Sequence, residues 1–398
     1  MLHLTATRWR DSLRIAAAVL LVSAPSVGGA QCVPPPTPPA GHLALMQLSL
    51  SNPAERQAHG ARVAMLWSDQ EYRPRIGGVY ALKYMMDDRE PGAEHDTNWY
   101  VANHPDWVAR KCDGSPAQEF SYSNGFRAPL DIRNPAVRAY LLNSNLGKVL
   151  HTGRFDGVAV DNLSGDNTWA RCGVLTSSGF RRDFTGVGVD PAFSAAQADW
   201  MRWLRLRVNA AGLCLAGNNY FSDDNPQGFL QIASALDIVV DEHGFTRNNR
   251  PLSLDAAWRT RMETYLSLPP GKPLVIIDYP AATQAQLSNT GLSWAIANFL
   301  MVKRANSYLS LTTLDGFDKW TEISALDIPI GAPLEAMHET GGLYSRRFEH
   351  VIAVVNPSSQ RAASMTLPTG EWRDLDGQPD RGALTLGPAT ALVLSAAR

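Results

Sequence analysis

Carboxylate side chains stand at the ends of two apolar runs in this sequence. Asp161 closes the run RFDGVAVDN (154–162), and Glu242 follows IVVD in the run IVVDEHGF (238–245). Two carboxyl groups on either side of a pocket can cleave a glycosidic bond. One, ionised, attacks or supports the sugar carbon, and the other, protonated, donates to the leaving oxygen. Asp161 and Glu242 are therefore the candidate catalytic pair, with Asp241 as the alternative acid.

Other polar side chains at predicted strand ends are candidate substrate ligands: Asp131, Asn162, Asn218, Tyr220, His243, Asp278 and Tyr279. Asp131 precedes Arg133 and Asn134, so a turn or a helix cap is an equal alternative for it. Asp87 and Asp88 also follow a predicted strand; we expect them in a solvated loop, with one of them lining the pocket as the alternative. No metal ligand set is predicted, because the Cys and His spacings do not match a zinc site.

Aromatic side chains fall in polar loops, where sugar rings could stack on them. Trp99, Trp107 and Trp169 are the candidates for substrate binding, with packing under long loops as an equal alternative. Trp200 and Trp203 differ, because they belong to an apolar stripe with helical spacing, which predicts burial in the core.

Alternating strand-like and helix-like segments must position these residues. The predicted strands are Leu43–Leu50, Gly78–Met85, Arg127–Ile132, Phe155–Asn162, Leu213–Asn218, Leu236–Glu242, Pro273–Tyr279 and Ser307–Thr312. Asn134-Pro135 is a typical helix start. Eight such units predict a (β/α)8 TIM barrel over residues 43–332, whose active site lies at the carboxyl ends of its strands. A doubly wound sheet is the alternative, but no glycine-rich dinucleotide turn follows the first strand.

The side-chain alternation of a strand gives a register for the candidate pair. If Asp161 points into the barrel, Gly157 and Ala159 do too, whereas Val158 and Val160 face the helices. At the sixth strand, an inward Glu242 places Val240 and Ile238 inside and Asp241 outside. An inward Asp241 would instead place Asp237 inside, so Glu242 is the preferred acid.

The pattern changes beyond the barrel. Short alternating runs separated by turn residues predict a small antiparallel β-sandwich over residues 333–398. Before the barrel, Pro-rich residues 31–42 predict an extended leader. Residues 1–30 combine arginines, an apolar run and small residues, which predicts a signal peptide cleaved near Ala30 and a secreted or periplasmic protein. We expect no membrane span.

Four cysteines, Cys32, Cys112, Cys172 and Cys214, allow three complete pairings. Export permits disulfides. Cys112 and Cys172 follow barrel strands and are predicted to be bridged, whereas Cys214 could be a buried thiol. The net charge of −2 and the absence of long charge runs argue against a nucleic acid partner, and 45% hydrophobic residues argue against disorder.

Four segments resemble the glycosyl hydrolase-like family 15: HPDW (104–107), LDIRNPAVRAYL (130–141), FDGVAVDN (155–162) and EHGF (242–245). The resemblance spans roughly residues 43–398. FDGVxxDN also recurs in several barrel glycosidases, in which the fourth-strand Asp is the nucleophile and the sixth-strand acid donates the proton. The resemblance thus implies Asp161 as nucleophile, Glu242 as acid, and retention of configuration.

These observations predict an exported glycoside hydrolase that acts on a poly- or oligosaccharide without a cofactor. A catalytically silent carbohydrate-binding barrel is the alternative from another class. The hypothesis of an esterase or deacetylase that acts on polysaccharide is less favoured, because no GxSxG motif is present.

Overall fold

The computed structural model describes residues 31–39, 41–48, 52–68, 77–89, 95–121, 125–247, 250–317, 319–380 and 382–396. The predicted signal peptide lies outside the described residues. No helix among them is long and apolar enough to cross a membrane.

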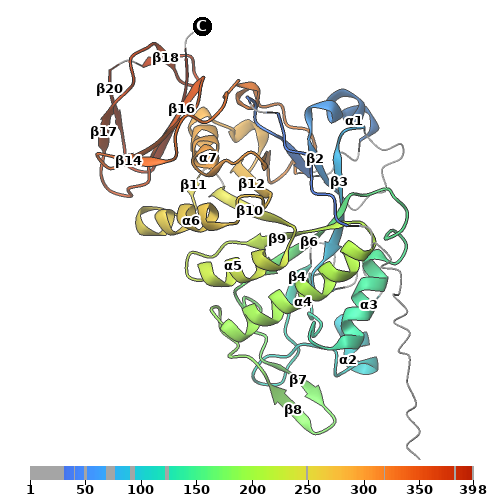
Figure 1. The fold of residues 1–398 in the computed structure, drawn as a ribbon. Helices are drawn as coiled ribbons and strands as arrows, with labels where there is room; N and C mark the ends of the chain where they lie inside the picture. The colour runs from blue at the N-terminus through green and yellow to red at the C-terminus, as the bar shows by residue number, and fades with distance from the viewer. Residues whose placement is uncertain are drawn as a thin grey trace, which may run out of the picture.

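Within the described residues, eight parallel strands form the barrel (Figure 1). They are β1 (Met46–Leu48), β2 (Met65–Ser68), β3 (Tyr80–Met86), β6 (Gly157–Ser164), β9 (Cys214–Tyr220), β10 (Ile238–Arg247), β12 (Leu274–Ala281) and β13 (Ser307–Thr313), in this order around the sheet. A parallel bridge between Leu45 and Leu309 joins the first and last strands. The predicted barrel is therefore confirmed.

One predicted barrel strand is wrong, and one was missed. The segment Arg127–Ile132 is not in the barrel sheet, because Leu130 makes only an isolated antiparallel bridge to Val108. The true second strand is β2, which pairs with both β1 and β3. The two errors offset each other in the numbering, so Asp161 is still on the fourth strand and Glu242 on the sixth.

Helices connect the strands on the outside of the barrel. They are α1 (Pro53–His59), α2 (Thr97–Asn103), α3 (Pro135–Leu146), α4 (Pro191–Ala210), α5 (Pro226–Ala235), α6 (Asp255–Ser267) and α7 (Asn289–Val302), with 3₁₀ turns at Gly60–Arg62, Gln284–Gln286 and Ser324–Asp327. The predicted start of α3 is confirmed, since the Asn134 side chain accepts from the Ala136 N–H. Helices α4 and α5 also begin with a proline after an Asp or Asn cap.

Antiparallel strand pairs among the described residues extend from the barrel strands or their connections. The first is β4 (Glu119–Ser121) with β5 (Gly125–Arg127), and the second is β7 (Gly173–Thr176) with β8 (Gly179–Arg182). In the third, the end of β10 turns back and pairs with β11 (Arg250–Pro251). The predicted bridge between Cys112 and Cys172 is confirmed, with Cα atoms 5.0 Å apart. It ties the connection after β3 to the loop after β6.

The apolar interior of the barrel alternates with an outer layer along each strand. Ala159 lies in the interior cluster with Ala216 and Val240, whereas Val158 and Val160 pack in a separate cluster that contains α3 and α4 residues. Trp200 is buried in that outer cluster, as the helical stripe predicts. The register predicted from the sequence is therefore confirmed at β6 and β10.

The described part of the Pro-rich leader, residues 31–39, packs at the amino ends of the barrel strands. Cys32 is bridged to Cys214, the first residue of β9, so the interpretation of Cys214 as a free buried thiol is wrong. The hydroxyl of Tyr80, at the start of β3, donates to the Val33 carbonyl at 2.9 Å, and that of Tyr308 on β13 donates to the Pro36 carbonyl at 2.9 Å. Three strands are thus connected to one extended segment.

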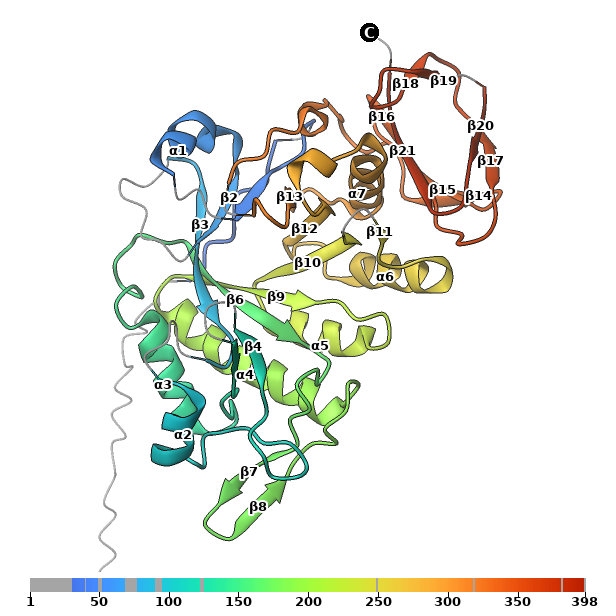
Figure 2. The ribbon, with the colours of Figure 1, turned by 180° about the vertical axis from the view of Figure 1, so that it is seen from behind.

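The C-terminal part is an antiparallel β-domain (Figure 2). One sheet contains β14 (His338–Thr340), β15 (Leu343–Arg347), β16 (Val351–Asn356), β21 (Thr390–Ala396), β18 (Trp372–Arg373) and β19 (Pro379–Asp380), and the other pairs β17 (Ala363–Thr366) with β20 (Ala383–Leu386). Both sheets contribute to one apolar cluster. The β-domain is confirmed, and its sandwich arrangement and the boundary at 332/333 stay predictions.

Helix α7 connects the barrel to the β-domain. Every residue from Gly291 to Val302 is buried. Its apolar side chains share one cluster with Val239 and Ile276 of the barrel and with Ala353 and Val393 of the β-domain. A helix that is apolar on all sides belongs between two packed layers.

Candidate active site

Five consecutive strands place a polar or aromatic side chain above the apolar interior, at the carboxyl end of the barrel. These residues are Tyr84, Asp161, Asn218, Glu242 and Tyr279, from β3, β6, β9, β10 and β12. Each follows an interior residue by two positions: Leu82, Ala159, Ala216, Val240 and Ile277. Because alternate side chains of a strand share a face, the five residues point into the same space.

Asp161 accepts hydrogen bonds from both sides. The Tyr84 hydroxyl donates to Oδ2 at 2.8 Å, and the Asn218 side-chain amide donates to Oδ1 at 2.9 Å. The backbone N–H of Asn162 donates to Oδ1 at 2.8 Å, and its side-chain amide donates to Oδ2 at 3.2 Å. These donors fix the orientation of the carboxylate.

Glu242 is also bound at both carboxyl oxygens. The Tyr279 hydroxyl donates to Oε1 at 2.6 Å, and the Asn218 amide donates to Oε2 at 2.6 Å. One nitrogen, Asn218 Nδ2, therefore contacts both candidate carboxyls. Because they share this donor, Asp161 Oδ1 and Glu242 Oε2 lie close together.

Burial and the neighbouring charge of Asp161 raise the pKa of Glu242 to about 7. The Tyr279 and Asn218 hydrogen bonds act in the opposite direction, because they stabilise the ionised form. A carboxyl with this pKa is substantially protonated at neutral pH, so it can donate a proton there.

The residue after each candidate carboxylate has left-handed backbone geometry. Asn162 has φ 64° and His243 has φ 62°, values that are uncommon for residues other than glycine. Both fall within irregularities of strand pairing, between Val160 and Leu163 and between Glu242 and Arg247. Ala170, Asp255 and Ala389 also have positive φ, and among the described residues the two of this kind within the barrel strands are the ones that follow the candidate carboxylates.

Asp241 points away from the other carboxyls into the outer layer. It is fully buried, and it accepts hydrogen bonds from the Phe221 N–H at 3.2 Å and from the Tyr265 hydroxyl of α6. Burial raises its pKa to about 6. With no exposed surface, Asp241 cannot reach a substrate, which favours Glu242 as the acid.

Asp278 is likewise fully buried between barrel and helices. Its carboxylate accepts from the backbone N–H groups of Phe245, Thr246 and Tyr279 at 3.1, 2.8 and 3.0 Å. Burial raises its pKa to about 7. The structure therefore does not support substrate binding by Asp278, which instead holds the irregular end of β10.

Asp131 lies in a turn rather than at the end of a barrel strand. It is buried and forms an ion pair with Arg133 at 2.7 Å, and Arg133 also contacts Asp183 at 2.8 Å. Of the two alternatives for Asp131, this arrangement corresponds to the turn. Asp87 and Asp88 are buried as well, not solvated: Asp87 accepts from Gln197 at 2.9 Å, and Asp88 pairs with Arg171 at 2.6 Å.

The remaining polar candidates lie near the pair. Asn162 is exposed beside Asp161. Tyr220 is exposed at the end of β9, two residues beyond Asn218. His243 is half-buried, with its ring centroid 4.8 Å from that of Tyr279. Burial, aided by Arg247, lowers the pKa of His243 to about 4, so it is neutral at neutral pH.

The aromatic candidates separate into two kinds. Trp99 and Trp107 pack against the outer cluster, and their rings contact His95, His104 and Tyr140 with centroids 3.7 to 5.5 Å apart. Both therefore have the contacts that the packing alternative predicts, and their role in substrate binding stays a prediction. Trp169 is half-buried in the loop after β6, the strand that carries Asp161, and is compatible with sugar stacking.

Sequence reasoning missed Tyr84. The period-2 pattern of YALKYMM could have identified it, since Tyr80, Leu82 and Tyr84 alternate on one face. Among the described residues, one group has the composition of a metal site, Cys32, Cys214 and Asp237. Its two sulfurs form a disulfide and lie at the other end of the barrel, so it does not serve this site.

Comparison with solved structures finds glycosidases whose sequence identity to this chain is low. A GH27 β-L-arabinopyranosidase from Geobacillus stearothermophilus is 10% identical, covering 90% of this chain and 97% of its own, with a TM-score of 0.48. A GH31 dextranase from Flavobacterium johnsoniae is 11% identical, covering 91% and 52%, with a TM-score of 0.43. A cycloalternan-degrading enzyme from Trueperella pyogenes is 11% identical, covering 89% and 60%, with a TM-score of 0.39.

A comparison with curated proteins gave no significant match. The model of a protein family described as hypothetical glycosyl hydrolase family 15 matches residues 79–352, a range that includes Tyr84, Asp161, Asn218, Glu242 and Tyr279. The match covers more than half of the sequence, and this chain belongs to that family.

Proposed function

We propose that this protein is an exported glycoside hydrolase that cleaves a poly- or oligosaccharide with Asp161 as nucleophile and Glu242 as general acid and base. The observation that carries the proposal is the shared contact of both carboxyls with Asn218 Nδ2, at 2.9 and 2.6 Å. Membership of a glycosyl hydrolase family supports the reaction class.

In the first step, an Asp161 oxygen attacks the anomeric carbon while the glycosidic C–O bond breaks. Glu242 transfers its proton to the departing oxygen, which leaves as the alcohol of the aglycone. In the second step, the Glu242 carboxylate accepts a proton from water. The water oxygen bonds to the anomeric carbon and displaces Asp161, which regenerates both groups in their starting protonation states.

The separation of the carboxyls supports retention of configuration. Retaining enzymes hold them about 5–5.5 Å apart, whereas inverting enzymes hold them about 6.5–9.5 Å apart to admit a water. A shared nitrogen donor keeps one oxygen of each carboxyl close together, which favours the first class of geometry. The hydrogen bonds from Tyr84 and Asn162 leave Asp161 oriented for attack.

Export is supported by the two disulfides, Cys32–Cys214 and Cys112–Cys172, which persist in oxidising compartments. We propose cleavage near Ala30, which leaves Cys32 close to the mature amino terminus. Amino-terminal sequencing of protein secreted from a bacterial host tests this, and a start within the predicted signal peptide would contradict it.

The catalytic proposal is tested with a panel of bacterial and plant polysaccharides. Wild-type protein is expected to release new reducing ends from at least one of them, with proton NMR showing retention in the first-formed product. Asp161→Asn should lower turnover on the order of 10³-fold or more while keeping the fold, as judged by circular dichroism. Binding without turnover in the wild type would instead indicate the carbohydrate-binding alternative.

A further inference from the structure

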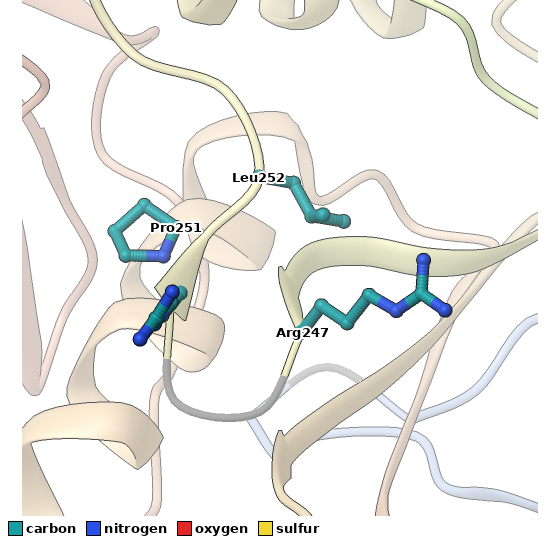
Figure 3. Close-up of a pocket in the computed structure, with 4 residues that line it drawn as sticks. Arg247, Pro251 and Leu252 are labelled. Carbon is teal, nitrogen blue, oxygen red and sulfur yellow. The ribbon is translucent and has the colours of Figure 1, made fainter.

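Strand β10 contains a bulge that begins directly after the candidate acid. Its pairing with β12 is regular as far as Glu242 and resumes at Arg247. The intervening residues 243–246 lie opposite a single β12 residue, Asp278. The bulge ends before the short hairpin with β11 that Figure 3 shows, and the Arg247 side chain runs away from that hairpin. Over the bulge, the regular backbone hydrogen bonds between the two strands are interrupted.

The carboxylate of Asp278 takes the place of the interrupted hydrogen bonds. It accepts from the backbone N–H groups of Phe245 at 3.1 Å and Thr246 at 2.8 Å, and from the Thr246 hydroxyl. Both residues and Asp278 itself are buried, so water does not bind these donors in place of the carboxylate. Because a buried N–H without an acceptor is costly, Asp278 stabilises the bulge in one conformation.

Side chains of two outer helices bind the carbonyl groups of the same bulge. Arg261 of α6 donates to the Gly244 carbonyl at 2.6 Å, and Trp294 of α7 donates to the Phe245 carbonyl at 3.1 Å. A Cβ atom on Gly244 would lie 2.4 Å from Ile276 Cγ2, so the backbone is also packed closely against β12. The bulge is therefore a fixed part of the barrel wall.

Asp278 is connected to Glu242 by two routes. The first is the backbone of the bulge, which starts at His243, the residue after Glu242. The second passes through Tyr279, whose backbone N–H donates to Asp278 at 3.0 Å and whose hydroxyl donates to Glu242 Oε1 at 2.6 Å. The rings of His243 and Tyr279 are in contact, with centroids 4.8 Å apart. One buried carboxylate thus fixes both backbone segments that flank the acid.

We propose that Asp278 is a positioning residue, which holds the Glu242 carboxyl where it can transfer a proton to the leaving oxygen. Asp278 has no exposed surface and acts only through the bulge and Tyr279. Proton transfer depends steeply on geometry, and a displacement of about 1 Å can cost about 10²-fold in rate. The proposal rests on the proposed function, because it concerns the acid of that site.

The kinetic test uses aryl glycosides of graded leaving-group pKa. In Asp278→Asn, an amide nitrogen that cannot accept replaces one carboxylate oxygen. We expect kcat for poor leaving groups to fall about 10–10²-fold, with KM and the cleavage of good leaving groups little changed. Thr246→Val, which removes the hydroxyl that binds Asp278, should show the same dependence more weakly, and Thr246→Ser should resemble wild type.

Asp241→Asn is the matched control, because that carboxylate is equally buried but is bound by Tyr265 of α6. It should destabilise the protein without changing the leaving-group dependence. Equal losses across the series in Asp278→Asn and Thr246→Val, or a loss in Thr246→Ser as large as in Thr246→Val, overturn the inference and leave the proposed function standing.

Crystal structures of the variants give a readout that does not need turnover. A Glu242 carboxyl displaced from Asn218 in Asp278→Asn or Thr246→Val, but not in Thr246→Ser, supports the inference even if wild-type protein cleaves no glycan. In that case the proposed function alone fails. A Glu242 carboxyl that keeps its wild-type position in both Asp278→Asn and Thr246→Val overturns the inference, whatever the activity of the wild type.

Discussion

Asn218 and Glu242 are bonded to each other in both directions. The Asn218 amide donates to Glu242 Oε2 at 2.6 Å, and the Glu242 backbone N–H donates to Asn218 Oδ1 at 3.1 Å. The acid is thus held by the strand between it and Asp161. Its position does not depend on a mobile loop, and preorganisation of this kind is what proton transfer in an active site requires.

Replacement of Glu242 with Gln tests its role as acid. The amide cannot donate a proton to the leaving oxygen, so we expect kcat/KM for natural glycans to fall by about 10²–10⁴-fold. Aryl glycosides with good leaving groups need little protonation and should retain much more of their bond-cleavage rate. The measurement is a series of aryl glycosides of graded leaving-group pKa. Equal loss across the series would contradict the assignment.

Replacement of Tyr279 with Phe tests the origin of the Glu242 pKa. Glu242 must be protonated to act, so kcat/KM should fall as the pH rises above about 7. The Tyr279 hydroxyl stabilises the ionised form and lowers this pKa, so its removal should raise the pKa and move the alkaline limb to higher pH. Tyr84→Phe is the matched control, because that hydroxyl contacts Asp161. If the alkaline limb of kcat/KM moves to lower pH in the Tyr279→Phe variant, this explanation is refuted.

Replacement of Asp241 with Asn separates the two adjacent acids. The buried carboxylate is bonded to Tyr265 and lies 3.8 Å from Arg261, so the change should lower stability by about 1–3 kcal/mol. It should leave the leaving-group dependence of the remaining activity unchanged and move the alkaline limb slightly to lower pH, because the Asp241 charge helps to raise the pKa of Glu242. Chemical denaturation and aryl-glycoside kinetics provide the two readouts. If the variant instead behaves as Glu242→Gln is expected to, Asp241 is the acid.

Trp169 and Trp107 are expected to respond differently to alanine. Replacement of Trp169, in the loop after β6, should raise KM for long glycans with little change in Tm. Trp107 packs against the outer cluster, with its ring centroid 4.0 Å from that of His104, so its loss should lower Tm. Thermal melts and kinetics on oligosaccharides of increasing length distinguish the two. An unchanged KM in Trp169→Ala on every length would exclude it as a subsite.

The bridge between Cys32 and Cys214 is expected to stabilise the fold. It closes a segment with a sequence separation of 182, and a disulfide of this kind contributes about 2–4 kcal/mol. The double variant C32A/C214A should lose that amount in urea unfolding and keep its activity at low temperature, because the bridge is at the opposite end of the barrel from Asp161. Stability equal to wild type would show that the leader is held without it.

The sequence predicts the register of the site because the rule behind it is local. Alternation along VAVDN is sufficient to place Asp161 inward with Ala159, and the same rule places Glu242 inward and Asp241 outward. The same alternation in YALKYMM places Tyr84 on the face of Leu82, although Tyr84 is not the last residue of its strand and so is not found from strand ends alone. The left-handed φ of Asn162 and His243 has no comparable local signature, because both residue types are common in ordinary backbone conformations.

Longer-range features could not be predicted in the same way. Strand β2 has four residues, and periodicity cannot distinguish so short an apolar run from a helical segment. The false strand at Arg127–Ile132 is an extended segment whose burial comes from tertiary contacts outside the barrel sheet. The partner of Cys32 depends on the path of the leader across the barrel, and neither sequence spacing nor composition determines that path.

Helix α7 shows that the two parts of this chain are not interchangeable modules. Its apolar residues are covered by barrel strands on one side and by β16 and β21 on the other. A barrel transplanted without the β-domain would therefore present a continuous apolar helix face to water. Descendants of this chain could exchange the hairpins and loops at the carboxyl rim, but recombination between barrel and β-domain would have to preserve the surface complementary to α7.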